Sequence, residues 1–420
     1  MDMRTVIIEP GRSFAQKCPD LQLSDSLIVV KHDVEIERLF TEAVAASSAN
    51  SSSAPEAYGK IAEYFDSMTT DPSLRARVRG EVELISQYVR DGAVYRPSVE
   101  TVRDYVMSKC AFICAEIVQS RFGGILVDGT SVMRCYEDDS LTKADWTDSV
   151  KDLARICDKK GVNYVISAGY GHTPEGYRRS LGPKASDLMA MLLAVETSSP
   201  EVVVYSSGSN LPAIREMSYE EAAVFCSLDS VTLSPSSLLP VQKAGIPVRI
   251  VSIEDLSSEC LVSDSRAVSG GPVTGYVLEN GLSLVSVLGT GLVGSVGVSS
   301  AIFGALARSN VNIRFISQPS SEYCISLVIS RKDLDKALKA LEPSILDGHD
   351  SIVTREEVSI ISVCGNRMRN VPGTSGKVFS ALGSAGVNII AAAQGGDELS
   401  ISVVIASSDA TKAENAIKSL

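Results

Sequence analysis

The segment Asn312-Ile-Arg-Phe-Ile-Ser-Gln318 has a second copy, Asn388-Ile-Ile-Ala-Ala-Ala-Gln394, shifted by 76 residues (312 to 388). The same shift carries the whole of 297–341 onto 373–417. Each copy follows the order strand, helix, strand, strand, helix. The strands are expected at 284–288, 312–317, 323–329, 358–363, 388–393 and 399–405, and the helices at 298–308, 332–341, 375–384 and 410–420. This order predicts a small α+β module with an antiparallel sheet and helices on one face, present in duplicate.

The loop after the middle strand of each copy is rich in polar side chains. It reads Gln318-Pro-Ser-Ser321-Glu322 in the first copy and Gln394-Gly-Gly-Asp-Glu398 in the second. These groups could hold the ammonium and carboxylate of a free amino acid, with the helix N-terminus beside Gly294 or Gly373 favouring the carboxylate. A solvated hairpin turn explains the same residues equally well. The residues alone leave both interpretations open.

Ser269-Gly-Gly-Pro272 interrupts the pattern and marks the predicted domain boundary. Before it, β-rich runs alternate with helical patterns, which is typical of an α/β domain. A helix at 186–196 joins two strands, which predicts that these strands pair in parallel. Residues 72–119 are expected to be mainly helical and 46–55 to form a loop. The strands are expected at 6–8, 26–30, 124–127, 162–167 and 201–205.

The predicted organisation is therefore an α/β domain at 1–268, a linker at 269–274 and two modules at 275–345 and 346–420. The last strand and helix of the chain are also candidates for completing the first module.

Composition limits the class of function. The 420 residues include 51 acidic and 39 basic side chains, for a formal net charge of -12, and no basic stripe is visible, so a nucleic-acid partner is not expected. Nine scattered cysteines without Cys-x-x-Cys are typical of reduced thiols in a cytosolic (cytoplasmic) protein. The N-terminus lacks a signal-peptide core, and no stretch approaches ~18 uncharged apolar residues, so no membrane segment is expected. His32, His172 and His349 lie far apart, so no histidine-built metal site is expected.

Gly289-Thr-Gly-Leu-Val-Gly294 satisfies the G-x-G-x-x-G pattern between a strand and a helix. A dinucleotide site would need an acidic residue about 20 positions further on, and the region near Arg314 has none. The second module has Gly365-Asn-Arg-Met-Arg-Asn370 at the same place. These glycines are therefore assigned to the first turn of the repeated module.

Three stretches of the N-terminal part are candidate ligand sites. Gly169-Tyr-Gly-His-Thr-Pro-Glu-Gly176 would let backbone approach a ligand, but a loop with a hairpin turn is favoured. Ser186 and Asp187 suit the N-cap and first turn of the next helix, which requires no ligand. Phosphoryl transfer requires Lys or Arg clamps and a carboxylate for magnesium around a Gly-rich turn. The first turn, Glu9-Pro-Gly-Arg-Ser13, has no lysine and carries an acid that would repel phosphate.

Several of these segments resemble the aspartokinases. Residues 312–328 and 376–404 are similar to the family's paired effector-binding segments, and Ser218-Tyr-Glu-Glu-Ala222 and Ala244-Gly-Ile-Pro-Val248 resemble other family stretches. The resemblance covers the whole chain, firmly after Val162 and loosely before it. It implies an α/β, amino-acid-kinase-like three-layer domain with a central, mainly parallel sheet, followed by tandem α+β ACT modules of the ferredoxin-like class.

The departures from the family fall on the chemistry. Ile8 stands where the family has the lysine that contacts the transferring phosphate, and Ala111 stands where it has a substrate-binding glutamate after Ser108. The family's Gly-Arg-Gly-Gly-Ser-Asp loop appears as Gly182-Pro-Lys-Ala-Ser-Asp187, without its arginine, and 206–216 has no counterpart of the Thr-Asp-Val-Asp-Gly stretch that walls the nucleotide. Four such changes around one site are expected to remove most of the rate.

The resulting hypothesis is an amino-acid-sensing regulatory homologue with little or no kinase activity, which dimerises through its ACT modules. The family's pockets bind lysine or threonine. The residues expected to line the effector pockets here are Asn312, Gln318, Ser321, Glu322, Asn388 and Gln394. Asp397 stands where a serine is commoner, so the two pockets are not expected to be equivalent.

The alternative is an active aspartate kinase, converting ATP and L-aspartate to 4-phospho-L-aspartate, or a kinase for a related small carboxylate. It would use ATP and magnesium, with Arg12 and Lys184 as substitute cations. Lys184, Ser186 and Asp187 would then be catalytic, and Ser108 and Gly169 would bind substrate. A third possibility is a structural subunit that pairs with a complete aspartokinase.

Overall fold

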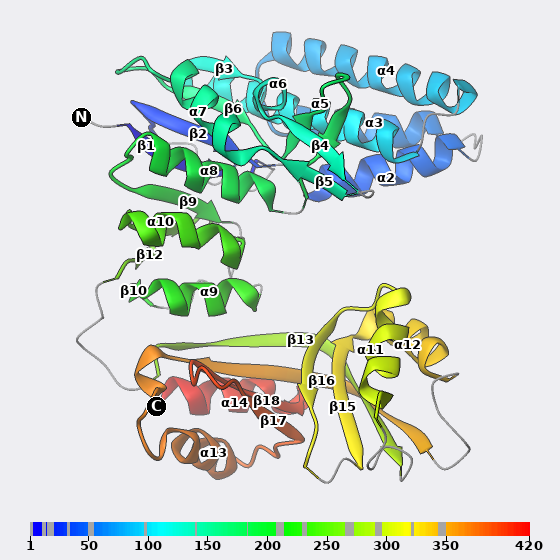
Figure 1. The fold of residues 1–420 in the computed structure, drawn as a ribbon, viewed down its shortest axis with the longest axis vertical. Coiled ribbons are helices and arrows are strands. Elements are labelled where there is room, and N and C mark those ends of the chain that lie inside the picture. The colour runs from blue at the N-terminus through cyan, green and yellow to red at the C-terminus, as the bar shows by residue number, and fades with distance from the viewer. Residues whose placement is uncertain are drawn as a thin grey trace. The chain divides into compact units, whose positions relative to one another are not determined.

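The computed structural model divides the chain into two units, Met1–Arg266 and Ala267–Leu420, which are described separately (Figure 1). Among the described residues, no helix is both long and apolar enough to cross a bilayer. The structure describes residues 3–10, 14, 21–31, 34–48, 54–95, 99–138, 141–182, 184–206, 214–228, 233–264, 273–289, 296–320, 323–342 and 350–420.

The N-terminal unit is built on an eight-stranded sheet in the order β10-β12-β11-β9-β1-β2-β6-β3. All neighbours pair in parallel except β11 and β12. The central strands are buried, nearly continuous apolar runs, as expected when helices cover both faces. The strands are β1 (Arg4–Ile8), β2 (Ser26–Val30), β3 (Ile125–Val127), β6 (Tyr164–Ser167), β9 (Val202–Ser206), β10 (Glu216–Met217), β11 (Val248–Ser252) and β12 (Glu259–Val262).

Alternate residues of these strands face different helix layers. Val6, Ile28, Val165 and Val203 belong to one core with helices α2 (Val34–Ser48), α3 (Ala54–Asp66), α4 (Pro72–Tyr95) and α5 (Val99–Phe122). Helix α8 (Ala185–Glu196) contacts β1 and β2, and α7 (Trp146–Ile156) and α10 (Leu238–Ala244) pack beside it. The predicted three-layer α/β architecture is confirmed.

Two local predictions need correction. Strands β6 and β9, which α8 joins, are parallel as predicted but do not pair with each other, because β2 and β1 lie between them. Residues 46–48 and 54–55 of the predicted loop are helical, since α2 extends to Ser48 and α3 starts at Ala54. The hairpin interpretation of 169–176 is confirmed by the antiparallel pair β7 (Tyr170–His172) and β8 (Arg178–Ser180).

The stretch Ser218-Tyr-Glu-Glu-Ala222 has a clear structural reason. It starts α9 (Tyr219–Ser227), where Ser218 Oγ accepts from the Glu221 backbone N–H at 3.2 Å and Glu221 Oε2 accepts from the Ser218 backbone N–H at 2.8 Å. This reciprocal capping box satisfies two backbone donors that the helix leaves open.

The C-terminal unit confirms the duplicated α+β pattern. Its six-stranded antiparallel sheet has the order β14-β15-β13-β16-β18-β17. Each repeat supplies two short strands, two helices and one long strand, and Figure 1 shows how far the long strands β13 and β16 extend. The elements are β13 (Gly275–Gly289), α11 (Val298–Arg308), β14 (Ile313–Ser317), β15 (Cys324–Ser330), α12 (Leu334–Leu341), β16 (Asp350–Cys364), α13 (Thr374–Ser384), β17 (Ala391–Gln394), β18 (Ser400–Ala406) and α14 (Ala410–Lys418).

The long strands are shared between the two halves of this unit. Val285 of β13 packs in the core of α11 and α12, whereas Tyr276 of the same strand packs in the core of α13 and α14. The register of β13 against β16 shifts near Gly281, whose φ of +75° suits glycine. A third core on the opposite sheet face combines Phe315 and Val404, so the halves of the sheet also pack against each other.

Candidate functional site

Three neighbouring parallel strands of the N-terminal unit, β3, β6 and β2, end beside one another, and the outer two are each followed by a charged residue. Val127 of β3 lies opposite Ile166 of β6, and Val30 of β2 lies opposite Ser167. Asp128 and Lys31 therefore leave their strands on either side of the end of β6. The carboxyl ends of parallel strands are the usual ligand-binding edge of an open α/β sheet.

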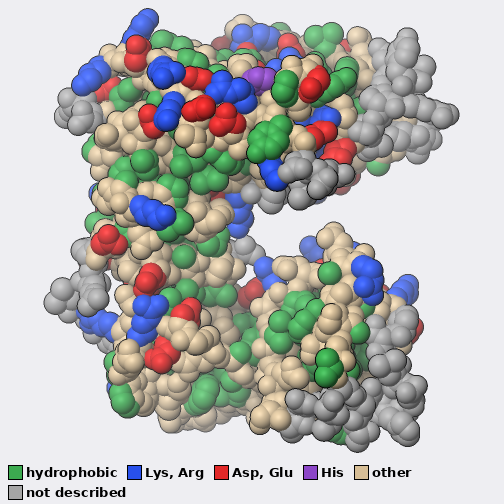
Figure 2. All heavy atoms as spheres, viewed as in Figure 1, with side chains coloured by type: hydrophobic (Ala, Val, Ile, Leu, Met, Phe, Trp, Pro, Cys, Tyr) green, Lys and Arg blue, Asp and Glu red, His purple; other side chains and the backbone are tan. Residues whose placement is uncertain are grey.

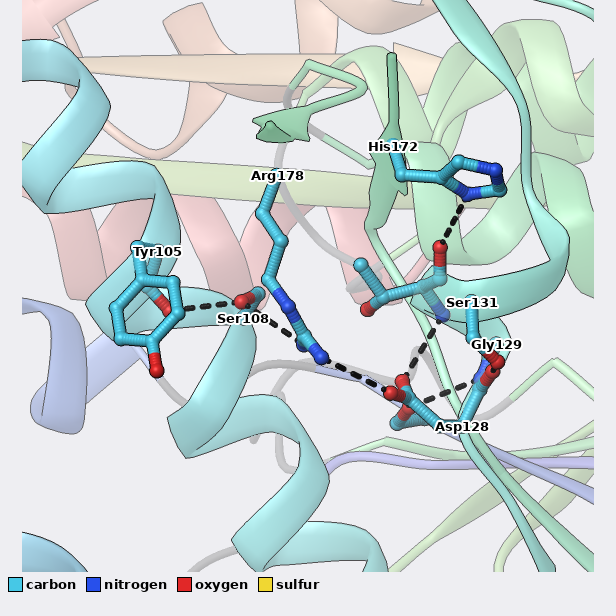
Figure 3. A network of polar contacts seen from close by, with 9 residues as sticks. Tyr105, Ser108, Asp128, Gly129, Ser131, His172 and Arg178 are labelled. Carbon is cyan, nitrogen blue, oxygen red and sulfur yellow. Dashed lines mark hydrogen bonds and ion pairs between the residues drawn. The ribbon is translucent and has the colours of Figure 1, made fainter. Parts of the chain in front are cut away.

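Asp128 is held in a compact polar network (Figure 3). Its Oδ1 accepts from the Thr130 backbone N–H at 3.1 Å and from Ser167 Oγ at 3.2 Å, and the Gly129 N–H donates to Ser167 Oγ at 3.1 Å. A Cβ on Gly129 would lie 2.1 Å from the Ser167 carbonyl oxygen, so only glycine allows this approach. The carboxylate of Asp128 is thus fixed at the end of β3.

Arg178 of β8 extends from the hairpin towards this carboxylate (Figure 3). One of its terminal nitrogens donates to Asp128 Oδ2 at 3.2 Å, and the other donates to Ser108 Oγ at 3.2 Å. Ser108 lies on α5, is fully buried, and donates to the Tyr105 carbonyl oxygen at 2.7 Å. The predicted substrate residue Ser108 therefore contacts an arginine that the sequence analysis did not identify.

Helix α5 also fixes the backbone of the hairpin. Asp104, one turn before Ser108, is buried and accepts a hydrogen bond from the Ser180 backbone. Burial raises the pKa of Asp104 above its usual 3.8. At the other end of the hairpin, His172 Nδ1 lies 3.0 Å from the Thr130 carbonyl oxygen. These contacts fix the hairpin backbone that carries the Arg178 side chain.

A buried ion pair lies at the end of β2. Lys31 Nζ is 2.7 Å from Asp187 Oδ1, and the two side chains are 12% and 0% exposed. Asp187 Oδ2 accepts from the Ser234 backbone N–H at 2.9 Å. The Lys31 N–H donates to the Ile8 carbonyl oxygen at 2.9 Å, so this lysine leaves the sheet directly beside the position where the resemblance places a lysine on β1.

The start of α8 differs from the prediction. The N-cap is Lys184, in the left-handed region at φ +65° and without a side-chain cap bond, so the prediction that Ser186 is the N-cap is wrong. Ser186 is already helical and buried, and a Cβ on Gly169 would lie 3.1 Å from its Oγ. The hydroxyl faces the end of β6 because Gly169 has no side chain. Asp187 is in the first turn as predicted, and Lys184 is exposed.

The structure thus brings Gly169 next to Ser186, Asp187 next to Lys31, and Ser108 next to Arg178. Arg12 lies outside the described residues. Binding of magnesium by Asp187 would require displacement of Lys31 or of the Ser234 N–H. Within the described ranges, no group of three or more His, Cys, Asp or Glu could hold a metal ion.

The predicted effector residues lie at the ends of strands in the C-terminal unit. Gln394 ends β17, and its Oε1 accepts from Ser375 Oγ at 3.2 Å in the first turn of α13. Gln318 follows β14, and Asn312 precedes it, which separates these two by ~20 Å along the strand at ~3.3 Å per residue. Asn312, Gln318, Asn388 and Gln394 are all exposed, and Ser321 and Glu322 lie outside the described residues.

Basic and acidic side chains are interspersed on the face of the N-terminal unit seen in Figure 2. Ion pairs of the N-terminal unit include Arg134 with Asp152 at 3.0 Å and Arg155 with Asp152 at 2.9 Å. The charge pattern there is mixed rather than of one sign.

Comparison with known proteins finds similar proteins for both parts of the chain. The ACT domain model matches residues 285–344 and 361–419. The bifunctional aspartokinase/homoserine dehydrogenase 1 of Arabidopsis thaliana chloroplasts is 27% identical over 376 residues, covering 83% of this chain and 41% of that protein. The chain therefore spans less than half the length of this relative.

Two crystal structures share the fold over the whole chain. E. coli aspartokinase III in complex with lysine and aspartate has a TM-score of 0.80 at 18% identity, covering 100% of both chains. The aspartate kinase of Clostridium acetobutylicum has a TM-score of 0.71 at 17% identity, covering 100% of this chain and 99% of the other. The protein is thus an amino-acid-kinase-like α/β unit followed by ACT domains. Its sequence and fold are similar to those of aspartokinases.

Sequence reasoning missed Lys31, Asp128 and Arg178. Lys31 and Asp128 did carry a signal, since each directly follows a short apolar run read as a strand. Arg178 lies in a polar stretch, where nothing in the sequence distinguishes it from the adjacent Arg179.

Proposed function

We propose that this chain is an amino-acid-sensing member of the aspartokinase family with little or no aspartate kinase activity. The observation that carries the proposal is the pairing of charged groups at the sheet edge. Lys31 is paired with Asp187 and Arg178 with Asp128, while the buried Ile8 and Ala111 occupy positions where the family has a lysine and a glutamate. A phosphoryl-transfer site instead needs cations directed at the phosphates.

Sensing is assigned to the ACT domains. The contact between Gln394 and Ser375 places an amide beside the start of α13, where backbone N–H groups favour a carboxylate. Lysine is bound in the E. coli structure with the same fold. A free amino acid of the lysine or threonine class is therefore the proposed effector, and a cytoplasmic homodimer formed through the ACT domains is the proposed state.

Calorimetric titration of the full chain with lysine, threonine and the other free amino acids tests the sensing role. Gln394→Ala and Gln318→Ala are expected to weaken binding. Lys412→Ala, which removes a surface ion pair of α14 with Asp409 in the same unit, is the control expected to leave binding unchanged. Absence of binding by every amino acid would reject sensing.

The second candidate is an active kinase for aspartate or a related small carboxylate. Lys31 favours it, because this cation leaves the sheet beside Ile8 and reaches the first turn of α8, near which Lys184 is exposed. Lys31 and Lys184 would then hold the phosphates of ATP. ADP release with ATP, magnesium and L-aspartate is the assay. Turnover lost in Lys31→Arg or Lys184→Ala would support this candidate, and no turnover would favour the sensing role.

A further inference from the structure

We propose that Arg178 binds the carboxylate of a small-molecule ligand. Ser108 positions the guanidinium. Asp128 pairs with Arg178 when no ligand is bound, so the ligand carboxylate must displace Asp128. This proposal concerns the N-terminal unit and goes beyond amino-acid sensing by the ACT domains. The arginine lies outside 182–187, the segment that resembles the family's arginine-containing loop.

Asp128 and Ser108 do not use all the N–H donors of Arg178. A guanidinium has five N–H donors, and carboxylates usually accept two of them in parallel at ~2.7–2.9 Å. Arg178 gives one nitrogen to Asp128 and the other to Ser108, each at 3.2 Å. The described residues thus engage two donors, on different nitrogens and at long distances, so a ligand carboxylate can form the closer two-bond arrangement.

The two charged side chains are partly exposed to solvent, whereas the serine that contacts Arg178 is buried. The side chains of Arg178 and Asp128 are 22% and 23% exposed, whereas Ser108 is fully buried. The Ser108 hydroxyl uses its proton on the Tyr105 carbonyl oxygen, so towards Arg178 it serves only as an acceptor. Ser108 is therefore a positioning residue.

Asp128 can release Arg178 without being left unsatisfied. Its Oδ1 keeps the Thr130 N–H and the Ser167 hydroxyl, and only Oδ2 loses its partner. Because both side chains are partly exposed, water replaces that contact at small cost. The hairpin backbone is held by Asp104 and by the bond from the Leu181 N–H to the Gly169 carbonyl oxygen at 3.0 Å, so the exchange needs only side-chain movement.

The two members of the ion pair should have opposite effects on binding. Asp128→Asn keeps the oxygen that accepts from Thr130 and removes the competing charge. It is expected to raise the affinity for L-aspartate and succinate about tenfold, which corresponds to about 1.4 kcal/mol. Arg178→Gln is expected to lower that affinity at least about tenfold. Arg179→Gln is the matched control, since Arg179 is the next residue of β8 and pairs with Glu137.

The full chain is titrated and followed by the fluorescence of Trp146, its only tryptophan, which lies in the N-terminal unit. Amino-acid binding to the ACT domains is measured separately, as the binding that is lost in Gln394→Ala. The sensing proposal and the Arg178 proposal can therefore each fail while the other holds. Asp128→Ser, which keeps a residue suited to the N-cap of α6 (Gly129–Val132), is the second variant if Asp128→Asn does not fold. Unchanged or weaker binding in a folded, charge-free variant, or no carboxylate binding in any variant, would overturn the proposal.

Discussion

Replacement of Lys31 by methionine should strongly destabilise the N-terminal unit. Methionine keeps most of the length of the lysine side chain but removes its charge. The carboxylate of Asp187, which is 0% exposed, would retain the Ser234 N–H as its hydrogen-bond donor and lose its counter-ion. Breaking a buried ion pair from one side costs about 3–5 kcal/mol. At roughly 2–3 °C per kcal/mol for a unit of this size, the midpoint of thermal unfolding should fall by roughly 6–15 °C.

Trp146 makes the measurement specific. Because it is the only tryptophan and lies in the N-terminal unit, urea unfolding followed by its fluorescence reports on that unit and not on the ACT domains. A chain with two units need not unfold in one step, so a probe confined to one unit is required. Circular dichroism would mix the two transitions.

A double-mutant cycle isolates the interaction itself. Asp187→Asn should cost less than Lys31→Met, because the lysine retains some exposure to water. The double variant Lys31→Met/Asp187→Asn should be more stable than the sum of the single losses predicts, by about 2 kcal/mol, since neither buried charge remains. The reasoning is refuted if the single losses add within about 0.5 kcal/mol, or if Lys31→Met costs less than about 1 kcal/mol, as an exposed pair would.

Three further outcomes are expected. Burial raises the pKa of Asp104 above 3.8, so the folded state binds the proton of this carboxyl more tightly than the unfolded state does. The wild type should therefore lose stability relative to Asp104→Asn as the pH rises from about 4 to about 7. Urea unfolding followed by Trp146 fluorescence measures this difference, and a difference that is constant with pH would contradict the prediction. Cys324 is the only partly exposed thiol among the eight described cysteines and should be alkylated before the other seven, as followed by mass spectrometry. Burial raises the pKa of Cys226 and Cys260 to about 12 and should delay their labelling until unfolding. Ser218→Ala removes the cap of α9 and should cost about 1 kcal/mol in the same unfolding assay, and Ser218→Asp should recover most of that loss.

The C-terminal unit could be predicted from the sequence almost element by element because its signals are local. The 76-residue repeat sets the order of the elements, and short runs rich in apolar residues mark the strands. What the sequence did not show is the length of β13 and β16, which extend before the predicted strands and cross between the two halves. Local patterns show where a strand forms, but they do not show which strand it pairs with. The pairing of 275–279 with 360–364 joins residues far apart in the chain, so hydrophobic periodicity does not predict it.

The candidate site was harder to predict because its partners are far apart in the chain. Ser186 was expected to cap α8 from its type and position alone, but the absence of a side chain at Gly169 allows its hydroxyl to face β6 instead. Arg178 meets Ser108 across 70 residues and Asp128 across 50. Only the parallel register, which aligns the ends of β2, β6 and β3, places these groups on one edge.

The position of Lys31 changes what the loss of a motif residue means. Compared along the chain, Ile8 has simply replaced a lysine. In the folded unit, the next strand places an ammonium group beside it, and the backbone N–H of Lys31 bonds to the carbonyl oxygen of Ile8. A charge can therefore be retained by a neighbouring strand after it is lost from the original one, because adjacent strands lie only ~4.8 Å apart. Whether such a site still transfers phosphate depends on whether Asp187 releases the lysine, so the size of the Lys31–Asp187 coupling bears directly on the choice between a sensor and an active kinase.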